Sequence, residues 1–257
     1  MLRPRIIPCL LVKDKGLVKT INFGSPKYVG DPINAVRIFN EKQVDELMVL
    51  DIDATINSHE PDLKMIEFLA TECRMPLCYG GGIKTKEQAM TIFSLGVEKI
   101  AISSAAVEDP SLIGKISSQV GSQSVVVVID VKKIKPGKYE VFTYNGKKAT
   151  SKDPELFAQE AQRLGAGEIV INSIDRDGTM TGYDMDLVER VRNSTSLPMT
   201  VLGGAGSHED IGLLIKKFGI IGAAAGSLFV FKGIYRAVLI NYPDIHLKDK
   251  LVNENLI

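Results

Sequence analysis

The sequence predicts an α/β protein built as a single (β/α)8 barrel, the TIM-barrel architecture, on three observations. The chain has 257 residues, close to the length of about 250 that is typical of this architecture. Short runs rich in Val, Ile and Leu, typical of parallel strands buried on both faces, alternate eight times with segments of helical period. No linker or break in composition occurs, so we expect one domain over residues 1–257. A doubly wound open sheet is the alternative, but no G-x-G-x-x-G motif supports it.

The eight expected strands are near-continuous apolar runs rather than alternating ones. In chain order they are Arg5–Leu11, Glu46–Ile52, Pro76–Tyr79, Lys99–Ser103, Ser124–Asp130, Glu168–Ile174, Met199–Leu202 and Gly222–Ala225. Because the apolar residues do not alternate with polar ones, we expect both faces of each strand to be covered.

A segment with apolar residues at helical spacing follows each expected strand. The expected helices are Asn34–Val44, Leu63–Cys73, Lys86–Leu95, Ser111–Val120, Glu155–Leu164, Met185–Arg192, Asp210–Phe218 and Gly233–Ile240. Three helix starts carry an acidic N-cap before a first-turn proline, at Asp31-Pro32, Asp109-Pro110 and Asp153-Pro154. Thr85 with Gln88 predicts a capping box.

The chain repeats itself at an offset of 122 residues. The matches pair Glu46–Asp51 with Glu168–Ser173, Met75-Pro76 with Leu197-Pro198, Gly81-Gly82 with Gly203-Gly204, and Ala101–Ser104 with Ala223–Gly226. They predict two half-barrels, about 1–122 and 123–257, with two equivalent ligand sites on opposite sides of the barrel.

Composition narrows the class of function. Lys and Arg number 31 and Asp and Glu also number 31, which argues against nucleic-acid or membrane-surface binding. An odd number of cysteines and the lack of any long apolar segment favour a cytoplasmic protein without a disulfide framework. The three histidines are scattered and no cysteine pair has zinc-ligand spacing with one, so we expect no metal and no cofactor.

Two glycine clusters follow expected strands. Gly80–Gly82 comes after the third strand and Gly203–Gly206 after the seventh, and Ser103-Ser104 and Gly226-Ser227 complete each half. Glycine lets backbone N–H groups approach an anion closely, and a following helix start favours negative charge. Tight turns are the alternative, but the repetition in both halves favours two phosphate sites and an elongated ligand with a phosphate at each end.

Acidic residues end several expected strands. The string Ser173–Thr179 (Ser-Ile-Asp-Arg-Asp-Gly-Thr) follows the sixth strand, Asp130 ends the fifth and Asp51 lies at the end of the second. Active sites of (β/α)8 barrels lie at this rim, where carboxylates serve in acid–base catalysis or bind substrate hydroxyls. The alternative for any one of them is to cap the following helix.

Together these motifs resemble the HisF family, the cyclase subunit of imidazole glycerol phosphate synthase. The resemblance covers nearly the whole chain and rests on Arg5–Leu10, Gly80–Ile83, Gly121–Asp130, Gly165–Ile169, Ser173–Thr179 and Gly203–Gly206. It implies a barrel that takes ammonia from a partner glutaminase docked on the N-terminal face. The ammonia then crosses the core and reacts with a ribosylated bisphosphate intermediate, giving imidazole glycerol phosphate and an aminoimidazole carboxamide ribotide.

The resemblance also assigns roles residue by residue. The phosphate-binding positions fall on Gly82, Ser104, Gly178, Gly204 and Ser227. Lys19, in the loop after the first strand, corresponds to the lysine of the family's mobile active-site loop; otherwise it would be interpreted as a solvated surface lysine. Asp51, Asp130 and Asp177 correspond to substrate-handling or catalytic acids.

One departure from the family pattern bears directly on function. The family's two central carboxylates end the first and fifth strands; the fifth-strand acid is Asp130, but the first-strand position is Leu11. Leucine cannot transfer a proton, and general acid–base catalysis typically contributes about 10²–10⁴-fold. Asp14 lies too far along the loop to substitute. Leu202 and Asp53 also depart from the family, which often has serine and a smaller polar residue there.

The opposite end of the barrel keeps the family's charges. Arg5, Glu46, Lys99 and Glu168 fall on the ring of four residues at the ammonia entrance, and Glu98 falls on an acid that helps to dock the glutaminase. Alternating charges can close a narrow pore by salt bridges. Ordinary strand-end salt bridges are the alternative, because bottom-face residues in barrels often serve stability.

Three functions follow from these observations. The first is a barrel subunit that receives ammonia and passes it on, in a HisF-like branch linked to acetamidino sugar modification, with a separate sugar amidotransferase as acceptor. The strings Met1–Val12 and Ser196–Gly206 resemble that branch. The second is an active cyclase of histidine biosynthesis. The third is a free-standing isomerase of the related HisA type, which the charged ring and Leu11 disfavour.

Overall fold

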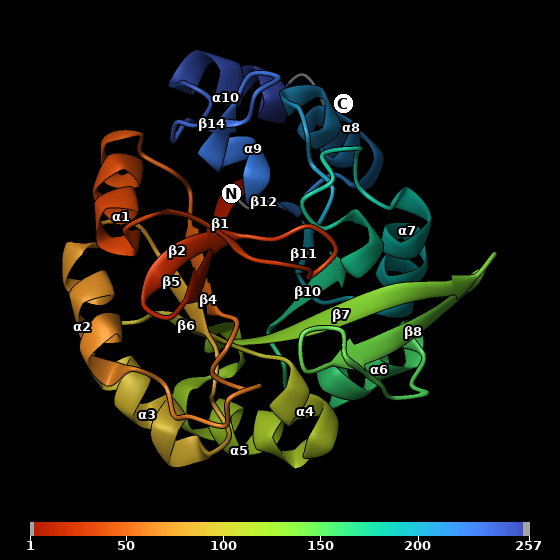
Figure 1. The fold of residues 1–257 in the computed structure, drawn as a ribbon. Coiled ribbons are helices and arrows are strands. Elements are labelled where there is room, and N and C mark those ends of the chain that lie inside the picture. The colour runs from red at the N-terminus through yellow and green to blue at the C-terminus, as the bar shows by residue number, and fades with distance from the viewer. Residues whose placement is uncertain (1–2, 254–257) are drawn as a thin grey trace.

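Eight parallel strands close into a barrel in the computed structural model, which describes residues 3–253 (Figure 1). In barrel order they are β1 (Arg5–Lys13), β4 (Leu47–Asp51), β5 (Leu77–Gly80), β6 (Lys99–Ile102), β7 (Val125–Lys135), β10 (Glu168–Ser173), β11 (Met199–Leu202) and β12 (Gly222–Ala225). The last strand pairs in parallel with the first, from Arg5 with Gly222 to Pro8 with Ala225. The prediction of a (β/α)8 barrel is therefore confirmed. Met1 and Leu2, used above for the resemblance, lie outside the described residues.

Helices surround the barrel. The longer ones are α1 (Pro32–Glu41), α2 (Leu63–Glu72), α3 (Lys86–Ser94), α5 (Ser111–Val120), α6 (Pro154–Arg163), α7 (Met185–Ser194), α8 (His208–Phe218) and α10 (Ile245–Asn253). Shorter ones are α4 (Ser104–Glu108), α9 (Ser227–Val230) and the 3-10 turns η1 (Ser122–Ser124) and η2 (Ile174–Arg176). Between residues 3 and 253, no helix is both long and apolar enough to span a membrane.

Three of the four predicted helix N-caps are confirmed. Asp31 and Asp153 cap their helices through the side chain, and Thr85 forms the capping box with Gln88. Asp109 does not act as the N-cap of α5, because that helix begins two residues later at Ser111. The Asp109 carboxylate still accepts a hydrogen bond from the Ser111 N–H at 3.1 Å.

The helix predicted over Gly233–Ile240 is wrong. The segment forms a hairpin of β13 (Phe231–Lys232) and β14 (Ala237–Val238), with left-handed backbone at Gly233 (φ 71°), and the outer helix forms later, as α10. The apolar residues at 234, 235, 238 and 239 imitate a helical stripe. However, Ile234 is 88% exposed and Tyr235 91% exposed, so they have no surface to pack against.

Two antiparallel extensions continue from barrel strands. β1 runs on to pair with β2 (Gly16–Lys19), which pairs with β3 (Lys27–Gly30). β7 runs on to pair with β8 (Lys138–Thr143), which pairs with β9 (Lys148–Ala149), and projects from the barrel in Figure 1. The sequence prediction ended these two barrel strands at Leu11 and Asp130, so it missed both extensions.

The side chains inside the barrel form an apolar cluster distinct from the larger core under the helices. Its members are Ile7, Cys9, Met48, Cys78, Ala101, Val126, Val128, Val170, Leu202 and Ala224. Ala101 and Ala224 both point inward, whereas Ala223 packs in the outer core. The predicted match of Ala101 with Ala223 is therefore wrong by one residue, since neighbouring strand residues face opposite sides. The counterparts across β6 and β12 are Lys99 with Gly222 and Ala101 with Ala224.

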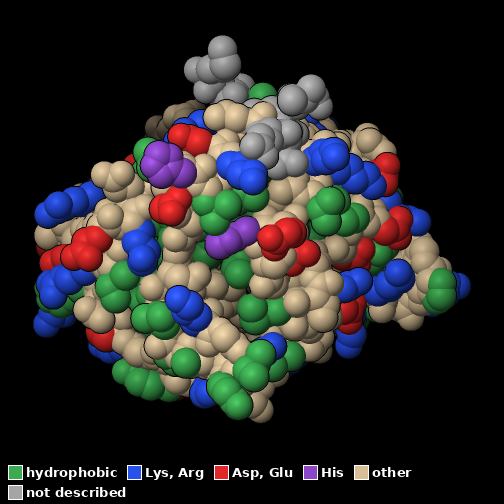
Figure 2. All heavy atoms as spheres, turned by 90° about the horizontal axis from the view of Figure 1, so that it is seen from above, with side chains coloured by type: hydrophobic (Ala, Val, Ile, Leu, Met, Phe, Trp, Pro, Cys, Tyr) green, Lys and Arg blue, Asp and Glu red, His purple; other side chains and the backbone are tan. Residues whose placement is uncertain are grey.

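One face of the molecule reflects the balanced composition. On the face shown in Figure 2, acidic and basic side chains are interspersed, without a broad patch of one sign.

Candidate functional site

One cavity lies at the carboxyl ends of the barrel strands. Its lining includes Leu11 and all the phosphate-binding, lysine and acidic positions that the family resemblance assigned: Lys19, Asp51, Gly82, Ser104, Asp130, Asp177, Gly178, Gly204 and Ser227. Residues from all parts of the chain thus converge on one space. The lining also includes Thr20, Phe23, Asn145 and Asn172, which the sequence analysis did not single out.

Two glycine pairs, Gly81-Gly82 and Gly203-Gly204, adopt backbone conformations that favour glycine. Gly82 has a φ of 71° and Gly204 a φ of 113°. A Cβ atom on Gly204 would lie 2.2 Å from the carbonyl oxygen of Gly182, so no side chain fits there. Each pair lies near a short helix that begins with a serine of the cavity, Ser104 in α4 and Ser227 in α9. This arrangement is suited to holding an anion by backbone groups.

Asp130 is the central carboxylate of the cavity. It accepts hydrogen bonds from Ser103 Oγ at 2.9 Å and from Asn172 Nδ2 at 2.8 Å. Burial raises the pKa of Asp130 to about 6, although these two hydrogen bonds lower it. The sequence analysis missed Asn172 as a partner, yet the register of β7 and β10 places it directly beside Asp130.

The position of the missing acid is occupied by an apolar surface. Leu11 lies half-buried in the cavity wall, paired with Leu50 of β4, and both pack against the interior cluster. Asp14 does not replace it, because it lies in the turn between β1 and β2 with its side chain 79% exposed. Among the described residues, Asp130 therefore has no carboxylate partner on the first strand.

Lys19 is buried rather than solvated. It ends β2, is 5% exposed, and its Nζ donates a hydrogen bond to the carbonyl oxygen of Cys9 at 2.7 Å. Burial lowers the pKa of the Lys19 amine, although the nearby Asp177 raises it. The alternative interpretation of Lys19 as a surface residue is therefore wrong.

The loop after Lys19 is fastened to the loop after β10. Thr20 Oγ1 donates to Asp177 Oδ2 at 2.7 Å, the backbone N–H of Phe23 donates to the same oxygen at 3.1 Å, and the Asn22 N–H donates to the Asp177 carbonyl at 2.9 Å. Burial raises the pKa of Asp177, and its hydrogen bond from Thr20 lowers it. Asp177 thus positions this loop over the cavity.

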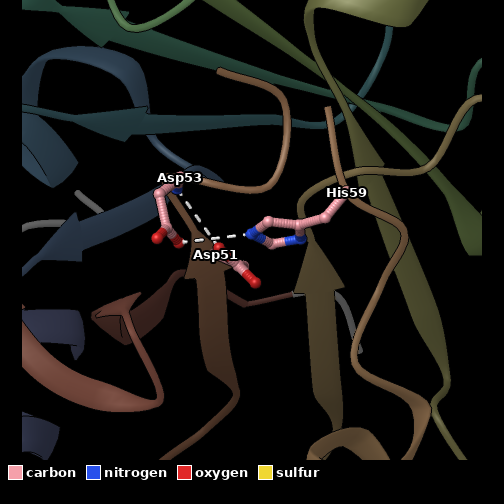
Figure 3. A group of neighbouring side chains, drawn as sticks. All are labelled: Asp51, Asp53 and His59. Atoms are coloured by element: carbon pink, nitrogen blue, oxygen red, sulfur yellow. Dashed lines mark hydrogen bonds and ion pairs between the residues drawn. The ribbon is translucent and has the colours of Figure 1, made fainter. Parts of the chain in front are cut away.

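Asp51, Asp53 and His59 form a cluster at the end of β4 (Figure 3). Asp51 Oδ1 accepts hydrogen bonds from the backbone N–H groups of Asp53 and Ala54, which folds the second carboxylate back beside the first. His59 Nε2 lies 3.9 Å from Asp53 Oδ1. Burial and the neighbouring Asp53 raise the pKa of Asp51 to about 7.

This cluster bears on the expectation that the protein has no metal. One ligand atom from each of the three residues lies within 4.8 Å of the others, and two carboxylates with an imidazole can bind a divalent cation. The sequence analysis missed it because His59 reaches the acids through an irregular loop, at no recognisable ligand spacing.

Four charged side chains close the opposite end of the barrel. Arg5 contacts Glu46 and donates to Glu168 at 2.7 Å, while Lys99 Nζ lies 2.9 Å from oxygens of both glutamates. Both glutamate side chains are nearly buried, at 4% and 6% exposure. Burial opposes the charge of Lys99, yet the two glutamates raise its pKa. We call these four residues the charged ring.

Glu98, next to the charged ring, is exposed and also has a local structural role. Its carboxylate accepts a hydrogen bond from the backbone N–H of Leu77 at 2.8 Å, at the start of β5.

Comparison with known proteins agrees with this architecture. The family model described as "Histidine biosynthesis protein" matches residues 5–235. A protein of Leptospira borgpetersenii, provisionally named imidazole glycerol phosphate synthase subunit HisF, is 59% identical over 95% of this chain and 96% of its own. A protein of Pseudomonas aeruginosa, provisionally named subunit hisF2 of the same synthase, is 54% identical over 97% of this chain and 99% of its own.

Sequence identity is lower to a relative whose name as a HisF subunit is not provisional. Imidazole glycerol phosphate synthase subunit HisF of Hyphomonas neptunium is 41% identical over 90% of this chain and 91% of its own. The family model includes the residues of the cavity and of the charged ring, and each of these relatives matches at least 90% of this chain. The chain therefore belongs to the histidine biosynthesis protein family, among the HisF-type subunits of imidazole glycerol phosphate synthase.

Proposed function

We propose that this chain is the barrel subunit of a glutamine amidotransferase complex that takes ammonia from a HisH-like glutaminase and delivers it at the cavity, with its cyclase chemistry impaired. The observation that carries the proposal is Leu11, which leaves Asp130 without a partner acid while the charged ring is complete. The glutaminase docks on the face that bears the ring, with Glu98 in the interface.

The interior of the barrel supports passage of ammonia. The charged ring, the apolar cluster and the cavity follow one another along the inward faces of the same strands. Neutral ammonia enters an apolar interior more readily than a charged ion, because transfer of a charge into such surroundings is costly. A shift of Lys99 away from the two glutamates would open the ring.

The acceptor of the ammonia is, on this proposal, a sugar amidotransferase that forms acetamidino sugars. The support is the resemblance of the Ser196–Gly206 string to that branch. The identity is also higher to the provisionally named relatives, at 54% and 59%, than the 41% to the Hyphomonas subunit. The phosphate-binding role of Gly82, Ser104, Gly178, Gly204 and Ser227 is retained in this proposal.

Cyclase turnover of the ribosylated bisphosphate intermediate, with saturating ammonium salt in place of the glutaminase, tests the proposal. Wild-type protein should turn over at least about 100-fold more slowly than Leu11→Asp, because only the variant restores the second proton-transfer group. Leu11→Asn is the matched control: it has the shape of the aspartate and no ionisable group, so it should stay slow. Equal, rapid turnover by wild type and Leu11→Asp would overturn the proposal.

An active cyclase of histidine biosynthesis is the second candidate function. It is favoured by Asp130 with its raised pKa and by the two glycine pairs of the cavity. In that case Leu11→Asp changes turnover little. The names of the relatives described above, all HisF subunits, argue against the isomerase.

A further inference from the structure

A buried side-chain oxygen that accepts no hydrogen bond, Asn172 Oδ1, lies in the cavity wall. Asn172 is 5% exposed, its Nδ2 donates to Asp130 Oδ1 at 2.8 Å, and its Oδ1 has no hydrogen-bond partner. A buried carbonyl oxygen without a donor costs about 1–3 kcal/mol. Such an atom therefore points to a ligand that supplies the hydrogen.

The orientation of the amide is fixed by its neighbour. Turning the Asn172 amide over would place its oxygen against the Asp130 carboxylate, two acceptors with no hydrogen between them. The oxygen that lacks a partner is therefore Oδ1 and not the other end of the group.

The described surroundings offer this oxygen no donor. Gly203 has no side chain, and a Cβ there would lie 3.1 Å from Asn172 Oδ1; Leu202 of the same wall is apolar. Ser103 donates its hydroxyl to Asp130, and Lys19 Nζ, which donates to Cys9, makes no hydrogen bond to Asn172 Oδ1. The donor must come from a molecule in the cavity.

Asn172 and Asp130 stand directly above the apolar interior. The inward face of β10 carries Glu168 of the charged ring, then Val170, then Asn172. On β7, Val128 is paired with Val170 and Asp130 with Asn172. A molecule that leaves the apolar interior on this side meets the amide oxygen and the carboxylate first.

We propose that Asn172 Oδ1 and the Asp130 carboxylate form a binding site for ammonia or ammonium at the exit of the barrel interior. Several N–H donors on one small centre match two oxygens on adjacent strands, and the leucines around them contribute no competing polar group. Asn172 is thus a positioning residue that holds the nitrogen beside Asp130. The inference rests on the proposed delivery of ammonia to the cavity.

Thallium(I), a monovalent ion that stands in for ammonium and scatters anomalously, tests the site directly. Crystals of the intact protein, soaked in thallium(I) acetate at pH 8 where Asp130 is ionised, should show an anomalous peak between Asn172 Oδ1 and the Asp130 carboxylate. Excess ammonium acetate in the same soak should displace the peak. Absence of the peak in wild type, or its persistence under excess ammonium, would overturn the inference.

Three variants separate the amide oxygen from the carboxylate. Asn172→Leu should weaken binding by about 10-fold or more, since the ion loses one of its two acceptors. Asn172→Asp keeps the oxygen but replaces the Nδ2 donor with a second carboxylate, which the cation itself would bridge to Asp130, so this variant should bind at least as tightly as wild type. Ser103→Ala removes the other partner of Asp130 and should keep the peak. An unchanged peak in Asn172→Leu would overturn the role of Asn172. The soak needs no cyclase turnover, so its failure is distinct from failure of the proposed function.

Discussion

Leucine at position 11 fits into the barrel wall without disturbing the strand pairing around it. Leu11 occupies its place on β1 with the pairing to β4 intact, and it joins Leu50 in extending the apolar interior upward into the cavity. Asp130 opposite keeps a pKa of about 6, so near neutral pH it is mainly a carboxylate that accepts hydrogen bonds. On the proposed function, one apolar residue leaves Asp130 without a second acid for paired acid–base catalysis and makes the site better suited to binding.

The Asp51–Asp53 pair predicts a dependence of stability on pH. The pKa of Asp51 rises from 3.8 to about 7 in the folded protein. The folded state therefore holds its proton more tightly than the unfolded state, and this contribution is complete below about pH 4 and lost as pH rises to about 7. At about 1.4 kcal/mol per pKa unit the full shift corresponds to about 4 kcal/mol, and because solvent screens part of this interaction we expect the free energy of unfolding of wild type to fall by roughly 1–3 kcal/mol across this range.

Asp53→Asn should flatten that dependence, because it removes the neighbouring charge. Denaturant unfolding measured between pH 4 and pH 8 checks the difference between variant and wild type. Glu67→Gln, at an exposed position of α2, is the control and should follow the wild-type curve. Identical curves for Asp53→Asn and wild type would show that the two carboxylates do not interact.

At the scale of helices and strands, the sequence predicts those elements whose residues are buried, because burial leaves a hydrophobic pattern in the sequence. Eight apolar runs became the barrel strands, because nearly all of their residues are covered on both faces. The extension of β7 escapes prediction because Lys132, Lys133 and Lys135 are exposed and carry no hydrophobic pattern. Asn172 and Thr20 escape as site residues for another reason: their partners come from strand register and loop contact, at separations of 42 and 157 residues.

The loop that carries Thr20 should open when its contact with Asp177 is removed. Thr20→Val deletes the hydroxyl that donates to Asp177 at 2.7 Å, a bond to a charged group worth about 1.5–3 kcal/mol. Amide hydrogen exchange over residues 17–24 should accelerate about 10-fold or more. Thr91→Val in α3, which deletes a hydroxyl bonded only to the Glu87 carbonyl, should leave that segment unchanged. Equal exchange rates of residues 17–24 in both variants would show that the Thr20–Asp177 hydrogen bond does not hold the loop.

At the scale of the whole molecule, the charged ring joins strands from both halves of the chain. Lys99→Met should lower the free energy of unfolding by about 3–5 kcal/mol, because two nearly buried glutamates lose a cation. Lys115→Met breaks an exposed pair with Asp109 and should cost less than about 1 kcal/mol. Chemical denaturation of both variants measures the two losses in the free energy of unfolding. A Lys99 variant as stable as the Lys115 variant would mean that the ring adds little to stability.

The charged ring is symmetric in its acids and asymmetric in its bases. Glu46 and Glu168 are counterparts under the internal repeat, but the counterpart of Lys99 is Gly222, where a Cβ would lie 1.9 Å from Thr200 Oγ1. That hydroxyl in turn holds Glu168 at 2.6 Å. Of these two counterpart positions, only the one on β6 carries a cation, while the space beside Gly222 on β12 is filled by Thr200. On the proposed function, ammonia crosses the ring by an eccentric path, and a docked glutaminase needs to act on only one edge of the barrel to admit it.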